Sequence, residues 1–269
     1  MKHYLNTYLI SLSIFILSSC SMKLDGYSDA NNYIGFAVED NSNVSVKEEI
    51  NIIDNYSFSA LSSETKEMTV YTEVEIMGSF SDIDRTFAFT QYTVKDELNA
   101  ESDKHFAKIS GNCIVKAGEA SVKLPITFKR ESLGDSVYSL GIQLVANNDF
   151  LLAEAVTQRR ILTISDKLVP FSNWEKHYGE NWNVANYIFG DYGLEKHKIM
   201  RDVLASKGEQ ISEKWLEEVL STDDSTIFAY WQGQFTLELN RINKERKALG
   251  QKELTESEKY RSVIVSFNF

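Results

Sequence analysis

The strongest constraint on this chain is the strict two-residue alternation over residues 69–77. The two alternating sets differ in polarity: Val70, Thr72, Val74 and Ile76 on one side, and Tyr71, Glu73 and Glu75 on the other. Because successive side chains of a β-strand point to opposite faces, this pattern predicts a strand with one buried and one solvated face. Such a strand is typical of an antiparallel sheet.

Similar short runs recur through the first two thirds of the chain. Turn residues separate them: Gly78, Gly111, Gly118, Gly134 and the pair Asn147-Asn148. We therefore expect further strands at 87–92, 113–116, 120–128, 139–145 and 160–164. Short antiparallel strands at this spacing predict an immunoglobulin-like β-sandwich.

Beyond Pro170 the apolar residues take helical spacing. Helices are expected at 194–206, 212–220 and 225–249, the second opened by Ser212 as its N-cap. Five large residues of the third helix share one face at steps of three and four: Phe228, Trp231, Phe235, Leu239 and Ile242. We expect this face to pack against the other two helices. Residues 262–269 alternate again and predict a closing strand.

The N-terminal segment predicts a lipoprotein signal peptide. An apolar run over residues 9–17 follows Lys2, is too short to cross a bilayer, and ends in the lipobox Leu17-Ser18-Ser19-Cys20. Cys20 is expected to carry the lipid. The chain then divides into a signal peptide (1–19), a lipidated tether (20–32), an immunoglobulin-like β-sandwich (33–168) and a smaller, mainly helical C-terminal domain (169–269). The fold class is thus mixed β and α.

Charge and cysteine content narrow the possible partners. The formal net charge is −11, which disfavours nucleic acid and anionic lipid headgroups as partners. No later stretch is long and apolar enough for a membrane helix, so membrane contact is expected through the lipid alone. With Cys20 lipidated, Cys113 remains as a single cysteine in an expected strand, where it is interpreted as a small apolar residue.

Few residues suggest chemistry. Asp82 and Asp84 lie two apart in a turn and are a candidate calcium site, with Asp149 or Asp40 supplying further oxygens. The favoured alternative is that Asp84 pairs with Arg85 or another arginine and that both acids cap the turn.

The histidines are dispersed without zinc-binding spacing. His177 and His197 lie near acids and are conceivable as an acid-base pair, but a helix surface ordinarily tolerates such a histidine. No catalytic role and no cofactor are expected.

An aromatic cluster follows Pro170 and contains the best candidates for a ligand-binding surface: Trp174, Tyr178, Trp182, Tyr187, Phe189 and Tyr192. Trp and Tyr combine flat apolar faces with a polar edge, which suits contacts with sugars or peptides. The favoured alternative is that the cluster seals one domain against the other.

Several segments carry a family resemblance. The stretches Gly78-Ser-Phe-Ser-Asp-Ile-Asp84-Arg85-Thr-Phe87, Ala100–Phe106, Lys116–Ile126, Leu144–Phe150 and Tyr187–Lys196 resemble a family of uncharacterised Bacteroidota lipoproteins with a domain of unknown function. The resemblance implies an accessory surface lipoprotein, commonly encoded beside outer-membrane transporter pairs of the starch-utilisation-system type.

The segment 100–126 is also similar to the Calx-β repeat, a calcium-binding sandwich. This chain keeps the Gly118-Glu119 turn but has His105-Phe106 where that repeat has its acidic pair. The missing carboxylates count against calcium, which needs several anionic oxygen ligands.

Together these observations predict a non-catalytic outer-membrane lipoprotein at the cell surface. We expect an accessory binding subunit for peptide or glycan capture, with a TonB-dependent transporter and its lid lipoprotein as partners. The alternative is a structural or adhesive surface lipoprotein without a small ligand.

Overall fold

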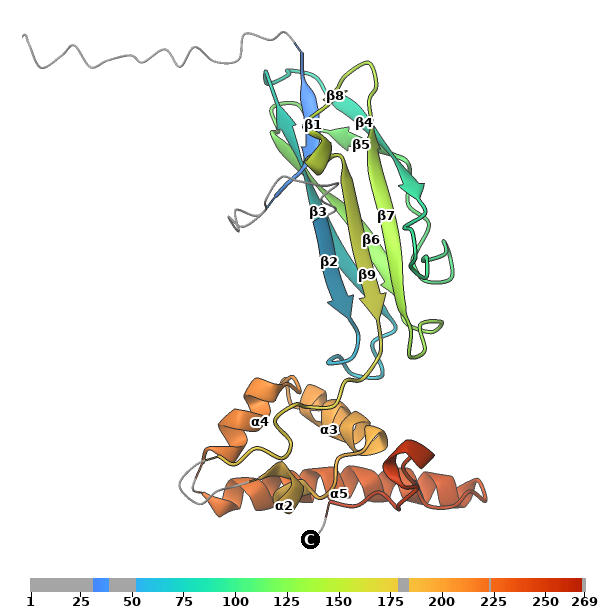
Figure 1. Cartoon of the computed structure of the whole chain (residues 1–269), viewed down its shortest axis with the longest axis vertical. Helices are drawn as coiled ribbons and strands as arrows, with labels where there is room; N and C mark the ends of the chain where they lie inside the picture. The colour runs from blue at the N-terminus through green and yellow to red at the C-terminus, as the bar shows by residue number, and fades with distance from the viewer. Residues whose placement is uncertain (1–30, 39–51, 179–183, 223, 268–269) are drawn as a thin grey trace, which may run out of the picture.

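The computed structural model describes residues 31–38, 52–178, 184–222 and 224–267. Two parts follow one another along the chain: a β-sandwich and a helical domain at one end of it (Figure 1). This confirms the predicted fold class.

The sandwich contains two sheets. The first has the strand order β6 (Ser121–Lys129), β3 (Glu67–Met77), β1 (Tyr33–Phe36) and β8 (Leu151–Leu152). The second has the order β2 (Ile52–Ser57), β9 (Arg159–Ser165), β7 (Val137–Val145), β4 (Arg85–Tyr92) and β5 (Asn112–Val115). A short 3-10 turn, η1 (Ala155–Thr157), precedes β9.

Six of these strands match the predicted ones to within two residues at each end. β3 has the expected faces, since Val70, Thr72 and Val74 are buried and Tyr71 is exposed. The pairing differs from the prediction at two places, because β1 pairs parallel with β8 and β2 pairs parallel with β9. The sandwich is therefore mainly, not wholly, antiparallel.

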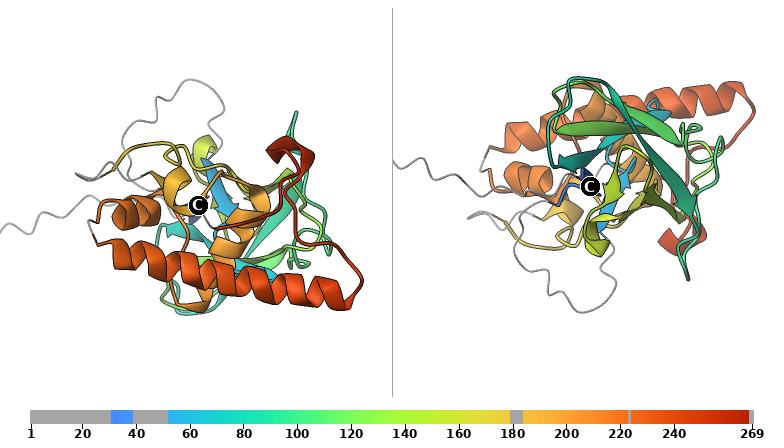
Figure 2. Two further views of the ribbon diagram at one scale, coloured as in Figure 1. Left: turned by 90° about the horizontal axis from the view of Figure 1, so that it is seen from below. Right: turned by 90° about the horizontal axis from the view of Figure 1, so that it is seen from above.

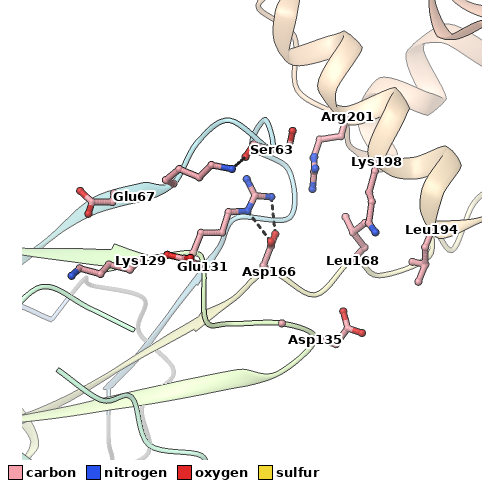
Figure 3. Close-up of a pocket in the computed structure, with 13 residues that line it drawn as sticks. Ser63, Glu67, Lys129, Glu131, Asp135, Asp166, Leu168, Leu194, Lys198 and Arg201 are labelled. Atoms are coloured by element: carbon pink, nitrogen blue, oxygen red, sulfur yellow. Dashed lines mark hydrogen bonds and ion pairs between the residues drawn. The ribbon is translucent and has the colours of Figure 1, made fainter. Parts of the chain in front are cut away.

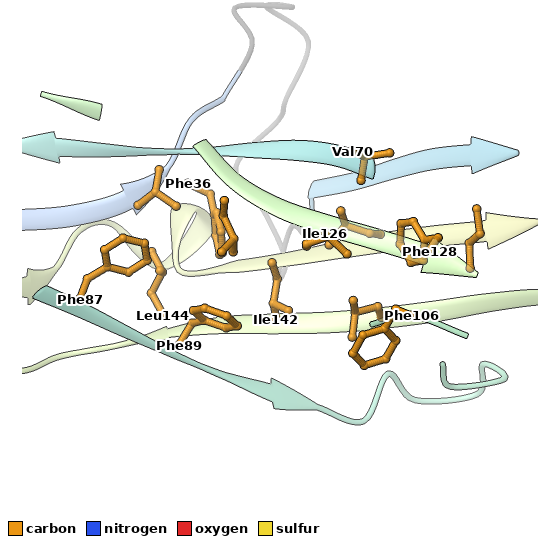
Figure 4. Packing of buried hydrophobic residues seen from close by; sticks show 14 of the residues in the cluster. Phe36, Val70, Phe87, Phe89, Phe106, Ile126, Phe128, Ile142 and Leu144 are labelled. Carbon is orange, nitrogen blue, oxygen red and sulfur yellow. The ribbon is translucent and has the colours of Figure 1, made fainter. Parts of the chain in front are cut away.

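The core of the sandwich lies between the two sheets (Figure 4). Phe36, Val70 and Ile126 of the first sheet face Phe87 and Ile142 of the second, and all five are buried. Burial of large apolar side chains at alternate positions is the main stabilising contribution available to such a sheet pair.

The helical domain contains α2 (Ala185–Phe189), α3 (Leu194–Ser206), α4 (Glu213–Leu220) and α5 (Ser225–Ala248), followed by a 3-10 turn, η2 (Glu258–Tyr260). The side chain of Ser212 accepts a hydrogen bond from the Trp215 amide at 3.0 Å, so Ser212 is the predicted N-cap. None of the described helices is both long enough and apolar enough to cross a membrane.

The apolar face of α5 packs as predicted. Trp231, Phe235 and Leu239 are buried in the helical core, and Trp231 meets Trp215 of α4 edge to face. In Figure 1, α3 and α4 lie between α5 and the sandwich, and Figure 2 shows α5 in front when the molecule is seen from below.

The predicted closing strand is absent from the described residues up to 267. In its place a single antiparallel bridge joins Thr255 and Ile264. Val265 and Phe267 are nonetheless buried against the helices, with the ring of Phe267 5.3 Å from that of Phe235. The alternation therefore marks side chains that enter the core from an irregular segment.

Candidate binding site

The structure places most of the candidate aromatic residues inside the helical core. Trp174 and Tyr178 are buried, and their polar edges are satisfied there. The Trp174 indole donates to the Gly190 carbonyl at 3.1 Å, and the Tyr178 hydroxyl accepts from Asn173 at 2.9 Å. These two residues pack within one domain and leave little surface for a ligand.

The remaining aromatic candidates are scattered. Tyr192 is partly buried and its hydroxyl lies 2.7 Å from Nδ1 of His197, whereas Tyr187 is 68% exposed on α2. Trp182 lies outside the described residues. The structure therefore does not gather the described members of this set on one surface.

Asp82 and Asp84 are exposed in the loop between β3 and β4. Asp84 pairs with Lys116 at 2.7 Å, instead of an arginine, and accepts from the Ala117 amide at 3.0 Å. The Lys116 hydrogen bond, followed by the Ala117 amide, lowers the pKa of Asp84 below its usual value. Asp149 accepts from the Thr86 amide at 2.8 Å, and Asp40 lies outside the described residues.

The Calx-β position also lacks metal ligands. His105 and Phe106, which replace the acidic pair of that repeat, are both fully buried, and the His105 ring stacks on Tyr138. Among the described residues, no three His, Cys, Asp or Glu side chains are placed to hold a metal ion. Cys113 lies partly buried on β5, and burial raises its pKa. Cys20 lies outside the described residues.

The two histidines of the conceivable acid-base pair lie in different environments. His177 is exposed, whereas His197 is buried and stacks on Phe171 with the ring centroids 4.6 Å apart. Burial, and secondarily the nearby Arg201 cation, lower the pKa of His197 to about 4. His197 is therefore neutral at pH 7 and serves the packing of α3.

A cleft of about 880 Å³ lies between the sandwich and the helical domain (Figure 3). Three parts of the chain line it. The sandwich contributes Ser63, Lys66, Glu67, Lys129, Arg130, Glu131, Gly134 and Asp135, the connection after β9 contributes Asp166 and Leu168, and α3 contributes Leu194, Lys198 and Arg201. Most of these side chains are charged, so the cleft suits a polar or ionic ligand.

Arg130 holds the sandwich side of the cleft in place. Its guanidinium makes two hydrogen bonds to the carboxylate of Asp166, at 2.7 and 2.8 Å, and donates to the backbone carbonyls of Ser62 and Thr65. It also lies over the ring of Phe58, with Cζ 5.4 Å from the centroid. A bidentate arginine–carboxylate pair fixes geometry as well as charge. The pair therefore joins the loop after β6 rigidly to the start of the interdomain connection.

Arg201 lies on the helical side. Only 5% of it is exposed, and among the described residues the structure gives its guanidinium one polar partner, Asp202, which accepts from Nε at 3.0 Å. Figure 3 shows the guanidinium pointing from α3 toward the sandwich loops. Its two Nη groups are therefore candidate donors to a carboxylate or another anion in the cleft.

Asp202 also joins the two domains. Its Oδ1 accepts from the Ser63 amide of the sandwich at 2.8 Å. Burial raises the pKa of Asp202, but the hydrogen bonds from Arg201 and Ser63 outweigh burial and bring the pKa below its usual value. The charged Asp202 thus links Arg201 on the helical side of the cleft to the sandwich loop that contains Ser63.

Sequence reasoning missed this site because its residues come from distant segments. Arg130 and Asp166 are 36 residues apart, and Ser63 and Asp202 are 139 apart. The spacing within the predicted helix 194–206 could have indicated one wall of the cleft. Leu194, Lys198 and Arg201 follow one another there at steps of four and three and so share a face.

Comparison with known proteins gives one family match. Residues 36–205 match a family model described as domain of unknown function (DUF4843). The matched segment includes all the motifs that carry the family resemblance and all the residues lining the cleft. No curated protein matches the sequence.

Several solved structures are similar to about half of the chain. They include an apo-form Calx CBD1 domain (12% identity, TM-score 0.33, 51% of this chain and 99% of that chain). A putative carbohydrate binding protein from Bacteroides ovatus ATCC 8483 has 9% identity and a TM-score of 0.34, over 51% of this chain and 37% of that chain. A multidomain protein including DUF1735 from Bacteroides ovatus has 10% identity and a TM-score of 0.35, over 49% of this chain and 44% of that chain. The present chain thus spans less than half the length of the two Bacteroides ovatus chains.

Proposed function

Because the chain belongs to the family described as domain of unknown function (DUF4843), we propose its role from its own structure: it is a lipid-anchored accessory binding protein of the outer membrane. The anchor is Cys20, and the ligand site is the interdomain cleft. Ligands are peptides or glycans that carry an anionic group, and the protein holds them beside a TonB-dependent transporter and its lid lipoprotein at the cell surface.

One observation carries the ligand assignment. Arg201 is nearly buried, yet among the described residues its only polar partner is Asp202, and it points into the cleft. A guanidinium in such a position binds a carboxylate, sulfate or phosphate through two parallel hydrogen bonds. Lys198, one turn away on α3, lines the same wall, and its ammonium group pairs with Glu195 at 2.7 Å.

The proposed mechanism is positioning. Acyl chains confine the protein to the membrane that contains the transporter, so a weakly held ligand is released at a high local concentration near its entrance. Binding is favoured over catalysis because hydrogen bonds within the protein already hold the cleft's Arg130–Asp166 pair and its neighbour Asp202. Such fixed charges suit recognition of a ligand group.

The ligand assignment is tested by calorimetry with the full chain and a panel of uronic-acid oligosaccharides, peptides with a free C-terminus, and neutral oligosaccharides. An anionic member should bind, and Arg201→Gln should weaken it about tenfold or more, because a charge-assisted bidentate contact is lost. Arg241→Gln, which changes an exposed arginine on α5, is the matched control. Binding of neutral members alone, or equal effects of both variants, contradicts the assignment.

The transporter partnership is tested by pull-down of the lipidated protein from native outer membranes in mild detergent. Recovery of a transporter and its lid lipoprotein supports the accessory role. Recovery of the protein alone, or as self-polymers, contradicts that role and favours the structural or adhesive alternative.

A further inference from the structure

The loop between β3 and β4 exposes two large apolar side chains at the end of the sandwich opposite the helical domain. Phe80 and Ile83 are each 72% exposed. Strand register places two more exposed apolar residues at the same end, since Met77 of β3 and Leu151 of β8 both pair with Tyr33 of β1. Exposed apolar side chains at one end of a domain are a feature of the kind that marks a contact surface. We call these four residues the apolar tip.

Hydrogen bonds hold the loop in shape. The Ser81 hydroxyl donates to the Ile83 carbonyl at 2.9 Å and accepts from the Ile83 amide at 3.2 Å. The Ser81 carbonyl accepts from the Gly118 amide of the neighbouring loop at 2.9 Å. The apolar side chains are thus presented by a loop with defined contacts on both sides.

The same loop is joined to the segment that enters the sandwich from the N-terminal side. The Ser79 amide donates to the Asn32 side chain at 3.1 Å. Gly78 has φ +130°, and a Cβ there would lie 2.7 Å from Oδ1 of Asn32, so the contact depends on a glycine. The apolar tip therefore lies where the chain coming from the proposed anchor reaches the sandwich.

The length of that connection limits how far the tip can be from the membrane. From Cys20 to Asn31 there are eleven residue steps, which span at most about 40 Å when fully extended. The helical domain lies at the opposite end of the sandwich (Figure 1). A lipid on Cys20 thus keeps Asn31, at the tip end of the sandwich, within about 40 Å of the bilayer.

Charge at the tip indicates which lipids it fits. Asp84 is neutralised by its pair with Lys116, whereas Asp82 and Glu119 are exposed acids on the two neighbouring loops. An acidic surface is repelled by anionic headgroups but accepts zwitterionic ones.

We propose that the apolar tip is a second membrane contact, in which Phe80 and Ile83 enter the interface of the zwitterionic bilayer that holds the acyl chains. The acyl chains attach the protein through Cys20 alone, so a second apolar contact adds to the attachment and orients the body. The sandwich then stands on the membrane with the interdomain cleft facing away from it. This inference rests on the lipid anchor of the proposed function, but not on the identity of the ligand.

The test uses the full lipidated chain in phosphatidylcholine vesicles. A nitroxide is attached at Ile83→Cys in a Cys113→Ala background, and its collisions with oxygen and with a water-soluble nickel chelate are compared. Leu249→Cys, at a residue 74% exposed after α5, is the matched control. We expect the label at position 83 to collide mainly with oxygen and the label at position 249 to collide mainly with the chelate.

A second readout is the rate at which the lipidated protein transfers between vesicles. Phe80→Ser combined with Ile83→Ser should speed transfer roughly 10- to 100-fold, since each large apolar side chain in the interface contributes on the order of tenfold. Leu237→Ser combined with Leu249→Ser should leave the rate unchanged.

The outcomes separate the two proposals. The acylation of the protein is first verified by intact mass. If the labels at positions 83 and 249 then both collide mainly with the chelate, the membrane contact is overturned and the anchor stands. Protection of position 83 only after addition of purified transporter overturns the membrane contact in favour of a protein contact. Absence of acyl mass on the mature chain overturns both the anchor and the contact.

Discussion

Glu256 accepts a hydrogen bond at 2.9 Å from the backbone amide of Lys196, which lies 60 residues earlier in the chain. Its other carboxylate oxygen accepts from the Glu195 amide at 3.0 Å, so one side chain caps two free amides at the N-terminus of α3. Glu256 thereby ties the segment after α5 to the helix that carries Arg201.

The carboxylate of Glu256 also acts on the buried side chain of Lys196. Burial lowers the pKa of Lys196 to about 8, opposed by the negative charges of Glu256 and Asp191. The ammonium group donates to the carbonyls of Phe189 and Asp191. The lysine thus closes the turn between α2 and α3.

Loss of the Glu256 cap should destabilise the helical domain. Glu256→Ala leaves two backbone amides unpaired in a buried place, and we expect a loss of about 1 to 3 kcal/mol in the free energy of unfolding by urea. Glu253→Ala, at an exposed position nearby, is the matched control and should change stability little. Equal stability of the two variants would show that the cap contributes nothing.

The Glu256 carboxylate fills the space beside Gly193, so a larger residue should not fit at position 193. A Cβ on Gly193 would lie 2.1 Å from the Glu256 carboxylate, so Gly193→Ala should displace Glu256 and lower the melting temperature. Gly233→Ala on α5 meets open space and should raise stability by about 0.5 to 1 kcal/mol, because alanine favours the helix. Thermal unfolding of both variants checks the opposite signs, and a rise for Gly193→Ala would contradict the packing.

His197 should make stability depend on pH. Its pKa is about 4 in the folded protein and 6.5 when unfolded, so the unfolded chain binds more protons between these values. The stability contribution is complete above pH 6.5 and is lost as the pH falls toward 4, by about 1 to 2 kcal/mol between pH 7 and pH 5. Urea unfolding at both pH values should show this loss reduced in His197→Gln. The exposed His177→Gln should keep it, and an unaltered loss in His197→Gln would contradict the assignment.

The Arg130–Asp166 pair should be essential to the sandwich side of the cleft. Arg130→Ala leaves a carboxylate and backbone carbonyls without their donor, and we expect a loss of about 3 to 5 kcal/mol in the free energy of unfolding. Arg241→Ala removes an exposed arginine that pairs with Glu238 and Glu245, and it should cost less than about 1 kcal/mol. Chemical denaturation compares the two, and similar losses would contradict the role of the buried pair.

Local patterns in the sequence were sufficient to predict the longer strands and helices. The alternation over 69–77 and the three- and four-residue steps of α5 describe which face of each element is apolar, and this information lies within each segment. The prediction missed β1, β2, β8 and α2, which are 4, 6, 2 and 5 residues long. The conformation of β1, β8 and β2 depends on pairing with β3, β1 and β9 respectively, and that of α2 depends on packing against α5.

For the candidate binding residues, too, local sequence and tertiary packing gave different information. Composition alone singled out Trp174 and Tyr178 as surface candidates, but packing of α3, α4 and α5 around them decided that they are core.

Local sequence was sufficient to predict the longer strands and helices, their apolar faces and the candidate anchor, because these depend on neighbours within a few residues. The partners of Arg130 and Glu256, and the contact of Asp202 with Ser63, depend on the tertiary structure. Hydrogen bonds across 36 to 139 residues depend on which segments the fold brings together, and no local spacing encodes them.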